Sequence, residues 1–245
     1  MLRRLPLVLA LVAAPAVALA QDDGDSGGEK APTNLDGVGR ITLQAGYRLT
    51  SNSTLYDAWY GARGPGNGLE RSAESSGAPL GAATFAYAMS DLVEVGIDLF
   101  GTAQSLRLTE PAGDGTTVSR KLSTVAYGLL IGLRFQGVLD VGPHGLVPFA
   151  GVLTGPAVVS STREGSSLQE KVSQAWVGSL GATLRLSANW GLTAEYRFMF
   201  LRGPVESPNG ETWAGPFSFS SGGSWFALGV TYAFPPDPSR PLSNF

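Results

Sequence analysis

The chain has 245 residues, a formal net charge of −3 and no cysteine. The absence of cysteine excludes a fold held together by disulfides, and the acidic balance argues against nucleic acid as a partner. Only three residues are lysine, whereas a surface that faces water usually carries more of them. The composition therefore indicates one sizeable domain whose exterior is not entirely in water.

Residues 1–20 predict a secretory signal peptide. A basic pair, Arg3 and Arg4, precedes an apolar stretch that ends in Ala18-Leu19-Ala20, which has the small-x-small form of a cleavage site. We expect cleavage after Ala20 and export of the mature chain. A polar, acidic leader follows over residues 21–36, and its composition predicts disorder.

Apolar and polar residues then alternate with period two, which is the signature of β-strands. Near residue 40, Ile41, Leu43 and Tyr47 fall on one face of a strand, and Arg40 and Gln44 fall on the other. In chain order, the pattern predicts strands at residues 40–49, 80–89, 93–99, 122–135, 146–156, 176–186, 192–200 and 226–234. Proline lacks the N–H that a ladder needs, so we expect the fifth strand to be bulged or bent at Pro156.

The connections between these strands alternate in length. Long polar segments follow every odd strand, at residues 50–78, 109–121, 160–173 and 202–223, and shorter turns follow the others. No segment after the signal peptide has the roughly 18 consecutive apolar residues that a membrane helix needs, so a membrane-spanning form must be a closed barrel. We predict an all-β fold, an eight-stranded antiparallel up-and-down barrel over residues 37–234.

Period two alone leaves open which face of the strands points outward. A soluble barrel buries its apolar face, whereas a membrane barrel turns that face toward lipid. Three features favour the membrane. The polar face is rich in glycine, alanine and threonine, aromatic residues stand near the ends of several apolar faces, and the two ends differ in loop length. We therefore expect a transmembrane barrel.

The chain resembles the small outer-membrane barrels grouped with the OmpA transmembrane domain and the OmpW-like proteins. The resemblance lies in residues 192–198 (LTAEYRF) and in residues 226–234 (FALGVTYAF), which are similar to the last two strands of that class. It implies a bacterial outer-membrane location and an assembly signal read by the insertion machinery: Phe226, Leu228, Val230, Tyr232 and Phe234. In the family this signal ends the protein, whereas here a Pro-rich tail follows over residues 235–245. Either the tail is a tolerated extension, or Phe245 is read instead.

Charged residues recur on the polar faces of the strands. By parity, eight point into the lumen: Arg40, Arg48, Glu94, Asp98, Arg134, Arg185, Glu195 and Arg197. A charge in a narrow lumen must find a partner or water. These side chains predict either a salt-bridged plug, which we favour, or a polar constriction that gates a channel.

No catalytic or metal site is expected, and no cofactor. The single histidine, His144, lies in the predicted turn at residues 136–145, and the resemblance implies that barrel enzymes place their histidine near the opposite rim. One histidine without cysteine is a poor metal site. Glu94 and Asp98 share a face as a carboxylate pair, but a small lumen has no room for a sugar between them.

These features predict a non-enzymatic outer-membrane barrel with a structural role in envelope integrity, or a role in surface contact. A narrow channel for small or hydrophobic solutes is the alternative that the OmpW-like resemblance implies. A lipid-modifying barrel enzyme is a third alternative, which the position of His144 disfavours. The expected partners are outer-membrane lipids and the insertion machinery, the expected state is a monomer, and no nucleic acid is expected.

Overall fold

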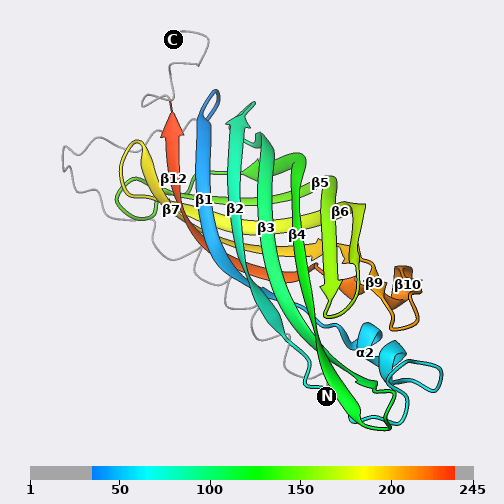
Figure 1. The fold of residues 1–245 in the computed structure, drawn as a ribbon. Helices are drawn as coiled ribbons and strands as arrows, with labels where there is room; N and C mark the ends of the chain where they lie inside the picture. The colour runs from blue at the N-terminus through cyan, green and yellow to red at the C-terminus, as the bar shows by residue number, and fades with distance from the viewer. Residues whose placement is uncertain (1–34, 235–245) are drawn as a thin grey trace, which may run out of the picture. The chain divides into compact units, whose positions relative to one another are not determined.

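A computed structural model of the chain describes residues 35–234. The predicted signal peptide, residues 21–34 of the predicted leader and the predicted tail lie outside the described residues. Eight long strands form one closed antiparallel barrel in which chain neighbours pair, and the first and last strands close the ring. They are β1 (Gly39–Leu49), β2 (Gly77–Ala88), β3 (Val93–Pro111), β4 (Thr117–Gln136), β5 (Leu146–Arg163), β6 (Leu168–Arg185), β7 (Trp190–Phe200) and β12 (Gly223–Phe234). The predicted fold is therefore confirmed, and Figure 1 shows β1 to β6 side by side.

The two rims of the barrel differ. At one rim, here called the turn end, the chain reverses through residues 89–92, 137–145 and 186–189, and β1 begins and β12 ends there. At the other rim, called the α2 end, lie a short helix, α2 (Ser53–Tyr60), and the connection between β7 and β12. Two of the four connections at the α2 end, residues 50–76 and 201–222, are long, as the sequence predicts.

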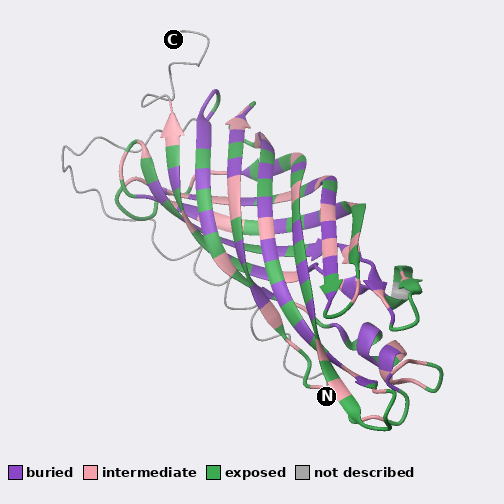
Figure 2. Cartoon of the chain, viewed as in Figure 1, coloured by how far each residue is buried: buried purple, intermediate pink, exposed green. Residues whose placement is uncertain are grey.

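Burial alternates along most of each barrel strand. The pattern in β7 is an unbroken alternation of exposed and buried residues, and Figure 2 shows the same stripes along β1 to β4. Because neighbouring side chains on a strand point to opposite faces, one set fills the lumen and the other covers the outside. The buried set is the polar one near the turn end, and the outer set carries large exposed hydrophobic side chains.

Two hairpins extend much further than the sequence predicts. The polar segments expected as loops at residues 109–121 and 160–173 are mostly strand, and only residues 112–116 and 164–167 connect β3 to β4 and β5 to β6. The prediction of long loops at these two places is wrong. Beyond the apolar belt the outer face becomes polar, so period two in hydrophobicity fades while the ladder of hydrogen bonds continues.

Helix α2 covers a free edge of this extension. β2 pairs with β3 only as far as Thr102, so the outer part of β3 lacks a neighbour on that side. The Tyr56 hydroxyl donates to the carbonyl of Arg107 at 3.0 Å, and the Trp59 indole N–H donates to the carbonyl of Thr109 at 2.8 Å. The N–H of Thr109 in turn donates to the Tyr60 hydroxyl at 2.8 Å. Aromatic side chains of α2 thus take the place of a missing strand.

The opposite edge of the extension, on β6, is covered by the connection between β7 and β12. This connection contains β8 (Arg202–Gly203), β9 (Val205–Glu206), β10 (Thr212–Trp213), η1 (Gly215–Phe217) and β11 (Phe219–Ser220). Ser173 donates to the carbonyl of Arg202 at 3.2 Å, and Gln169 donates to the Glu206 carboxylate at 2.8 Å. The ring of Trp213 meets that of Trp59 edge-on, with centroids 5.5 Å apart. The two edge covers therefore meet over the barrel.

Pro156 interrupts the ladder between β4 and β5 without changing its register. Gly128 pairs with Ala157 and Ile131 with Thr154, and the two positions between them are unpaired. Equal numbers of residues lie between these pairs on both strands, so no extra residue is inserted and no bulge forms. On its other side Pro156 still pairs with Gln174 of β6.

The folded part begins slightly before the predicted leader boundary. Leu35 is buried, and its N–H donates to the Asp91 carboxylate at 2.7 Å, so the turn after β2 holds the chain before β1. Within residues 35–234, no helix has the length and apolar character needed to cross a membrane.

Candidate functional site

All eight of the predicted charged residues lie at buried positions of the barrel strands, and six of them form one network across the lumen. The six are Arg40 of β1, Glu94 and Asp98 of β3, Arg134 of β4, and Glu195 and Arg197 of β7. Because β3 and β7 are not neighbours in the ring, these ion pairs brace opposite walls. The network holds three positive and three negative groups and is therefore neutral.

Arg197 is the centre of the network. Its Nη1 lies 2.6 Å from Asp98 Oδ2, and its Nε and Nη2 lie 2.9 Å from the two oxygens of Glu195. The Arg197 side chain is 1% exposed and the Asp98 side chain 0% exposed. The contact from Nη2 to Glu195 is a hydrogen bond, and the other two are ion-pair contacts.

Arg134 links the three carboxylates. Its guanidinium nitrogens lie 3.4 Å from Asp98, 3.7 Å from Glu195 and 3.7 Å from Glu94. It also stacks over the Phe149 ring, with 5.2 Å between the guanidinium carbon and the ring centroid. The remaining cavity beside Arg134 and Glu195 measures only about 10 Å³, which is no more than the room of a single water.

Glutamines and threonines, which are not among the predicted site residues, complete the network. Gln44 donates to Glu195 at 2.8 Å, and Gln136 accepts from Arg40 at 2.8 Å. Four threonines on neighbouring strands form a chain of hydroxyl contacts at 2.6–2.8 Å: Thr42, Thr231, Thr193 and Thr183. Their signal was the parity that they share with the charged residues.

Arg48 and Arg185 lie apart from the network, near opposite rims. Arg48 Nη1 donates to the carbonyls of Ser220 and Gly222, and its Nη2 donates to Gln104 at 2.6 Å. Arg185 donates to the carbonyl of Ala188 at 3.0 Å. Neither has a carboxylate within ion-pair distance among residues 35–234.

The half of the lumen toward α2 is mostly apolar, although Arg48, Gln104 and the Arg163–Glu110 ion pair are also buried there. Leu130 and Leu153 are almost fully buried behind the interrupted ladder at Pro156. Above them, one continuous cluster joins the barrel wall to α2 and to the last connection: Leu55, Tyr56, Trp59, Leu106, Leu108, Leu122, Val159, Val205, Phe219 and Trp225. Burial raises the pKa of Tyr56 to about 12. The lumen thus has a polar half toward the turn end and a mostly apolar half toward α2.

Outside, large hydrophobic side chains form a belt. On β4, Leu129, Ile131 and Leu133 are 46%, 53% and 46% exposed, and Tyr127 and Phe135 border them. Aromatic side chains also gather toward each rim. Trp190 meets Tyr232 at 4.9 Å between centroids near the turn end, and Tyr196 meets Phe226 at 5.1 Å further up. The residues of the predicted assembly signal lie on this outer face of β12.

His144 lies in the turn at residues 137–145, which belongs to the turn end. Among the described residues, no group of three histidine, aspartate or glutamate side chains is placed to hold a metal ion.

No protein-family profile and no curated protein matches the sequence. Solved structures of small outer-membrane barrels are similar in fold. OprG, an outer membrane protein of Pseudomonas aeruginosa, is 13% identical with a TM-score of 0.46, over 84% of this chain and 98% of its own. Ail, the attachment invasion locus protein of Yersinia pestis, is 10% identical with a TM-score of 0.44, over 81% and 99%. E. coli outer membrane protein W is 15% identical with a TM-score of 0.38, over 81% and 98%.

Proposed function

We propose that this chain is a monomeric outer-membrane barrel with a structural or surface-contact role, and that its lumen is closed. The support for the membrane is the exposed apolar belt, since contiguous apolar surface of this extent is rare on soluble proteins. On β4 the aromatic borders, Phe135 and Tyr127, are eight residues apart (135 − 127). At about 3.4 Å per residue and a tilt of about 40°, this spans about 21 Å, close to the apolar height of about 25 Å in such barrels.

The observation that carries the closed lumen is its filling at two levels. The cavity beside the ion-pair network has a volume of only about 10 Å³. The apolar cluster on the α2 side of the network continues into α2. A hydrated ion needs a continuous path of water through the lumen. The ion-pair network and the apolar cluster each interrupt such a path. What the barrel offers to its surroundings is then its outer belt and the covered α2 end.

Conductance in planar bilayers tests this proposal. The purified barrel should give no conductance steps, while a general porin in the same bilayers gives them. Truncating Arg134 to alanine should leave the barrel closed, because Leu130 and Leu153 still fill the half of the lumen toward α2. If the charges formed a gate, Arg134→Ala alone would conduct, and that result would overturn the closed lumen.

A narrow channel for hydrophobic solutes is the second candidate, and the interrupted ladder at Pro156 is the feature in its favour. Such a solute would have to leave the lumen between β4 and β5, where Leu130 and Leu153 now pack. Uptake of an apolar dye into vesicles measures this route. Dye entry that increases with Leu153→Ala would support the channel, and entry at the rate of empty vesicles in both proteins would support the closed barrel.

A lipid-modifying enzyme is the third candidate. His144 lies at the turn end, away from the rim where the outer leaflet would be. Incubation with lipopolysaccharide or phospholipid should leave both unmodified. Hydrolysis that survives replacement of His144 would reveal a site that the present argument lacks.

We propose further that the outer face of β12 is the assembly signal read by the insertion machinery. Its support is the run of outward side chains from Phe226 to Phe234, of which Leu228 is 71% exposed. Substituting Phe234 by alanine should lower the amount of heat-modifiable barrel in outer-membrane fractions, with Phe245→Ala as the matched comparison. If only the Phe245 variant fails to assemble, the end of the tail is the signal.

A further inference from the structure

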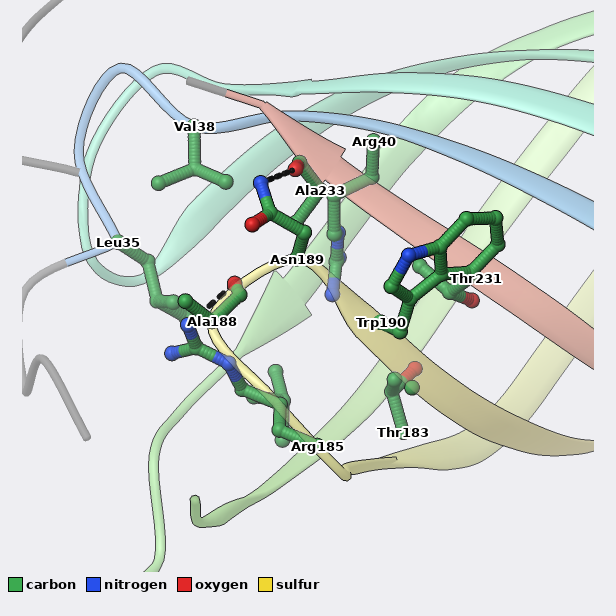
Figure 3. Close-up of a pocket in the computed structure, with 12 residues that line it drawn as sticks. Leu35, Val38, Arg40, Thr183, Arg185, Ala188, Asn189, Trp190, Thr231 and Ala233 are labelled. Carbon is green, nitrogen blue, oxygen red and sulfur yellow. Dashed lines mark hydrogen bonds between the residues drawn. The ribbon is translucent and has the colours of Figure 1, made fainter. Parts of the chain in front are cut away.

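An open hollow of about 450 Å³, here called the cationic niche, lies where β7 ends and the last connection begins. Its described lining includes Lys171 and Gln174 of β6, Phe200 of β7 and Arg202 of β8. The pocket at the turn end, beside Arg185, measures only about 20 Å³ and accommodates a single water (Figure 3). The cationic niche therefore has room for a headgroup-sized ligand, and the pocket at the turn end does not.

The cationic niche is positively charged, although the chain as a whole is acidic. Its described lining holds two cations, Lys171 and Arg202, and no carboxylate. The Arg202 guanidinium carbon lies 6.0 Å from the centroid of the Phe200 ring, and Ser173 donates to the Arg202 carbonyl at 3.2 Å. A phosphate monoester carries a charge of about −1.5 to −2 at pH 7, which two such cations would neutralise. The charge of the niche therefore favours a phosphate monoester.

A second hollow of about 450 Å³, here called the apolar groove, crosses the outer face of β5, β6 and β7. It includes Gly178 of β6, where an added Cβ would meet nothing within 4 Å. Exposed hydrophobic side chains border it, among them Leu180 and Phe198. The groove belongs to the outer belt, so its shape and chemistry suit a hydrocarbon chain.

The register between β6 and β7 places the two hollows one after the other. Gly178 pairs with Phe198 beside the apolar groove, and Trp176 pairs with Phe200 beside the cationic niche. Phe198 and Phe200 are neighbours on the outer face, about 7 Å apart along the strand. Aromatic side chains mark the level of the headgroups in membrane barrels. The niche thus lies at headgroup level, and the groove lies at the level of the acyl chains.

We propose that the cationic niche and the apolar groove together bind one lipid whose headgroup carries a phosphate monoester. The phosphate lies between the Lys171 ammonium and the Arg202 guanidinium, and one acyl chain runs past Phe200 over Gly178. This inference rests on the proposed membrane location with the α2 end toward the outside, and it is independent of whether the barrel conducts. It adds a lipid class and a defined site to the general contact of the belt with lipid.

Native mass spectrometry of the full-length mature chain in detergent tests the site, with dioleoyl phosphatidic acid as the probe. One lipid should be retained per barrel, and dioleoyl phosphatidylcholine, whose headgroup has no net charge, should be retained less. Lys171→Gln combined with Arg202→Gln should weaken the retention of phosphatidic acid by about tenfold or more, because two charged hydrogen-bond donors are lost. The matched control is Arg107→Gln combined with Lys121→Gln. It removes two exposed cations that are paired across β3 and β4, and it should keep the retention.

Filling the apolar groove tests the contact with the acyl chain. Gly178→Leu places a side chain in open space and should lower the retention of phosphatidic acid several-fold. Gly101→Leu on β3 also enters open space, away from both hollows, and should keep the retention. Gel mobility before and after heating reports whether each variant is a folded barrel.

Three results would overturn the lipid site in a folded barrel. The first is equal retention of phosphatidic acid by wild type and by the variant without Lys171 and Arg202, or equal retention of the two lipids. The second is displacement of the lipid by an equal concentration of inorganic phosphate with no effect of Gly178→Leu, which would assign the niche to free phosphate. The third is a dimer that Gly178→Leu dissociates and that holds no lipid, which would make a second copy the occupant. None of these results touches the proposed membrane location, which fails separately if the chain stays soluble without detergent.

Discussion

Replacing Asp98 by asparagine tests whether the ion-pair network holds the barrel walls together. The substitution keeps the size of the side chain and removes one negative charge from a position that is 0% exposed. Arg197 and Arg134 then face each other across the lumen with Glu195 and Glu94 as their remaining counter-ions. Breaking a buried ion pair in this way costs about 3–5 kcal/mol of unfolding free energy, because the partner charge stays buried.

The assay is reversible urea unfolding of the barrel in detergent or in vesicles, followed by tryptophan fluorescence. Asp57→Asn is the matched control, because Asp57 pairs with Arg71 at 2.7 Å but is 66% exposed. An exposed pair of this kind contributes about 0–1 kcal/mol. The double variant Asp98→Asn with Arg197→Gln should lose less than the sum of the two single variants, since it removes both charges of one pair. If Asp98→Asn and Asp57→Asn cost the same, water screens the lumen and the network does not brace the walls.

Three further results are expected. Ile131→Arg, at the middle of the outer belt, should lower the free energy of unfolding in vesicles by about 2–4 kcal/mol. Ser119→Arg, beyond the belt on the same face, should lower it little. Equal losses would argue against lipid around the belt. Gly132→Ala should destabilise the barrel by about 1–3 kcal/mol, because a Cβ there would lie 2.1 Å from the Val152 carbonyl oxygen, while Gly101→Ala meets open space and serves as its comparison in the same unfolding assay. Burial raises the pKa of Tyr56 from 10.0 to about 12, so its contribution to stability is complete below pH 10 and is lost as the pH rises to about 12. The difference in unfolding free energy between Tyr56→Phe and wild type should therefore change across this window, and a constant difference would contradict the burial of the hydroxyl.

The barrel was predictable because it rests on local information. Parity alone places Arg40, Asp98 and Arg197 on one side of their strands, and strand pairing then brings them into one lumen. The partners within the lumen were not predictable, because they depend on the register between strands far apart in the chain. Parity predicts that both Arg134 and Arg185 point into the lumen. Arg134 meets three carboxylates, whereas Arg185 meets none among residues 35–234.

Helix α2 and the long hairpins escaped prediction for a different reason. Residues 50–78 read as a polar loop, although Leu55, Tyr56 and Trp59 have the spacing of one helix face and are the buried residues of α2. Eight residues carry too little periodic signal to stand out, and the helix is held by tertiary contacts with β3. In β3 and β4 the ladder reaches Pro111 and Thr117, where no apolar face remains to reveal a strand.

The aromatic cover on β3 has a consequence for barrels that are crowded together. A strand edge with unused carbonyls and N–H groups is a template onto which another polypeptide can add a strand. The backbone groups of Arg107 and Thr109 on this edge are hydrogen-bonded by Tyr56, Trp59 and Tyr60. A neighbouring copy therefore cannot pair a strand with them. A chain that lost α2 would keep its barrel, but the edge of β3 would be open to strand addition by a neighbouring copy.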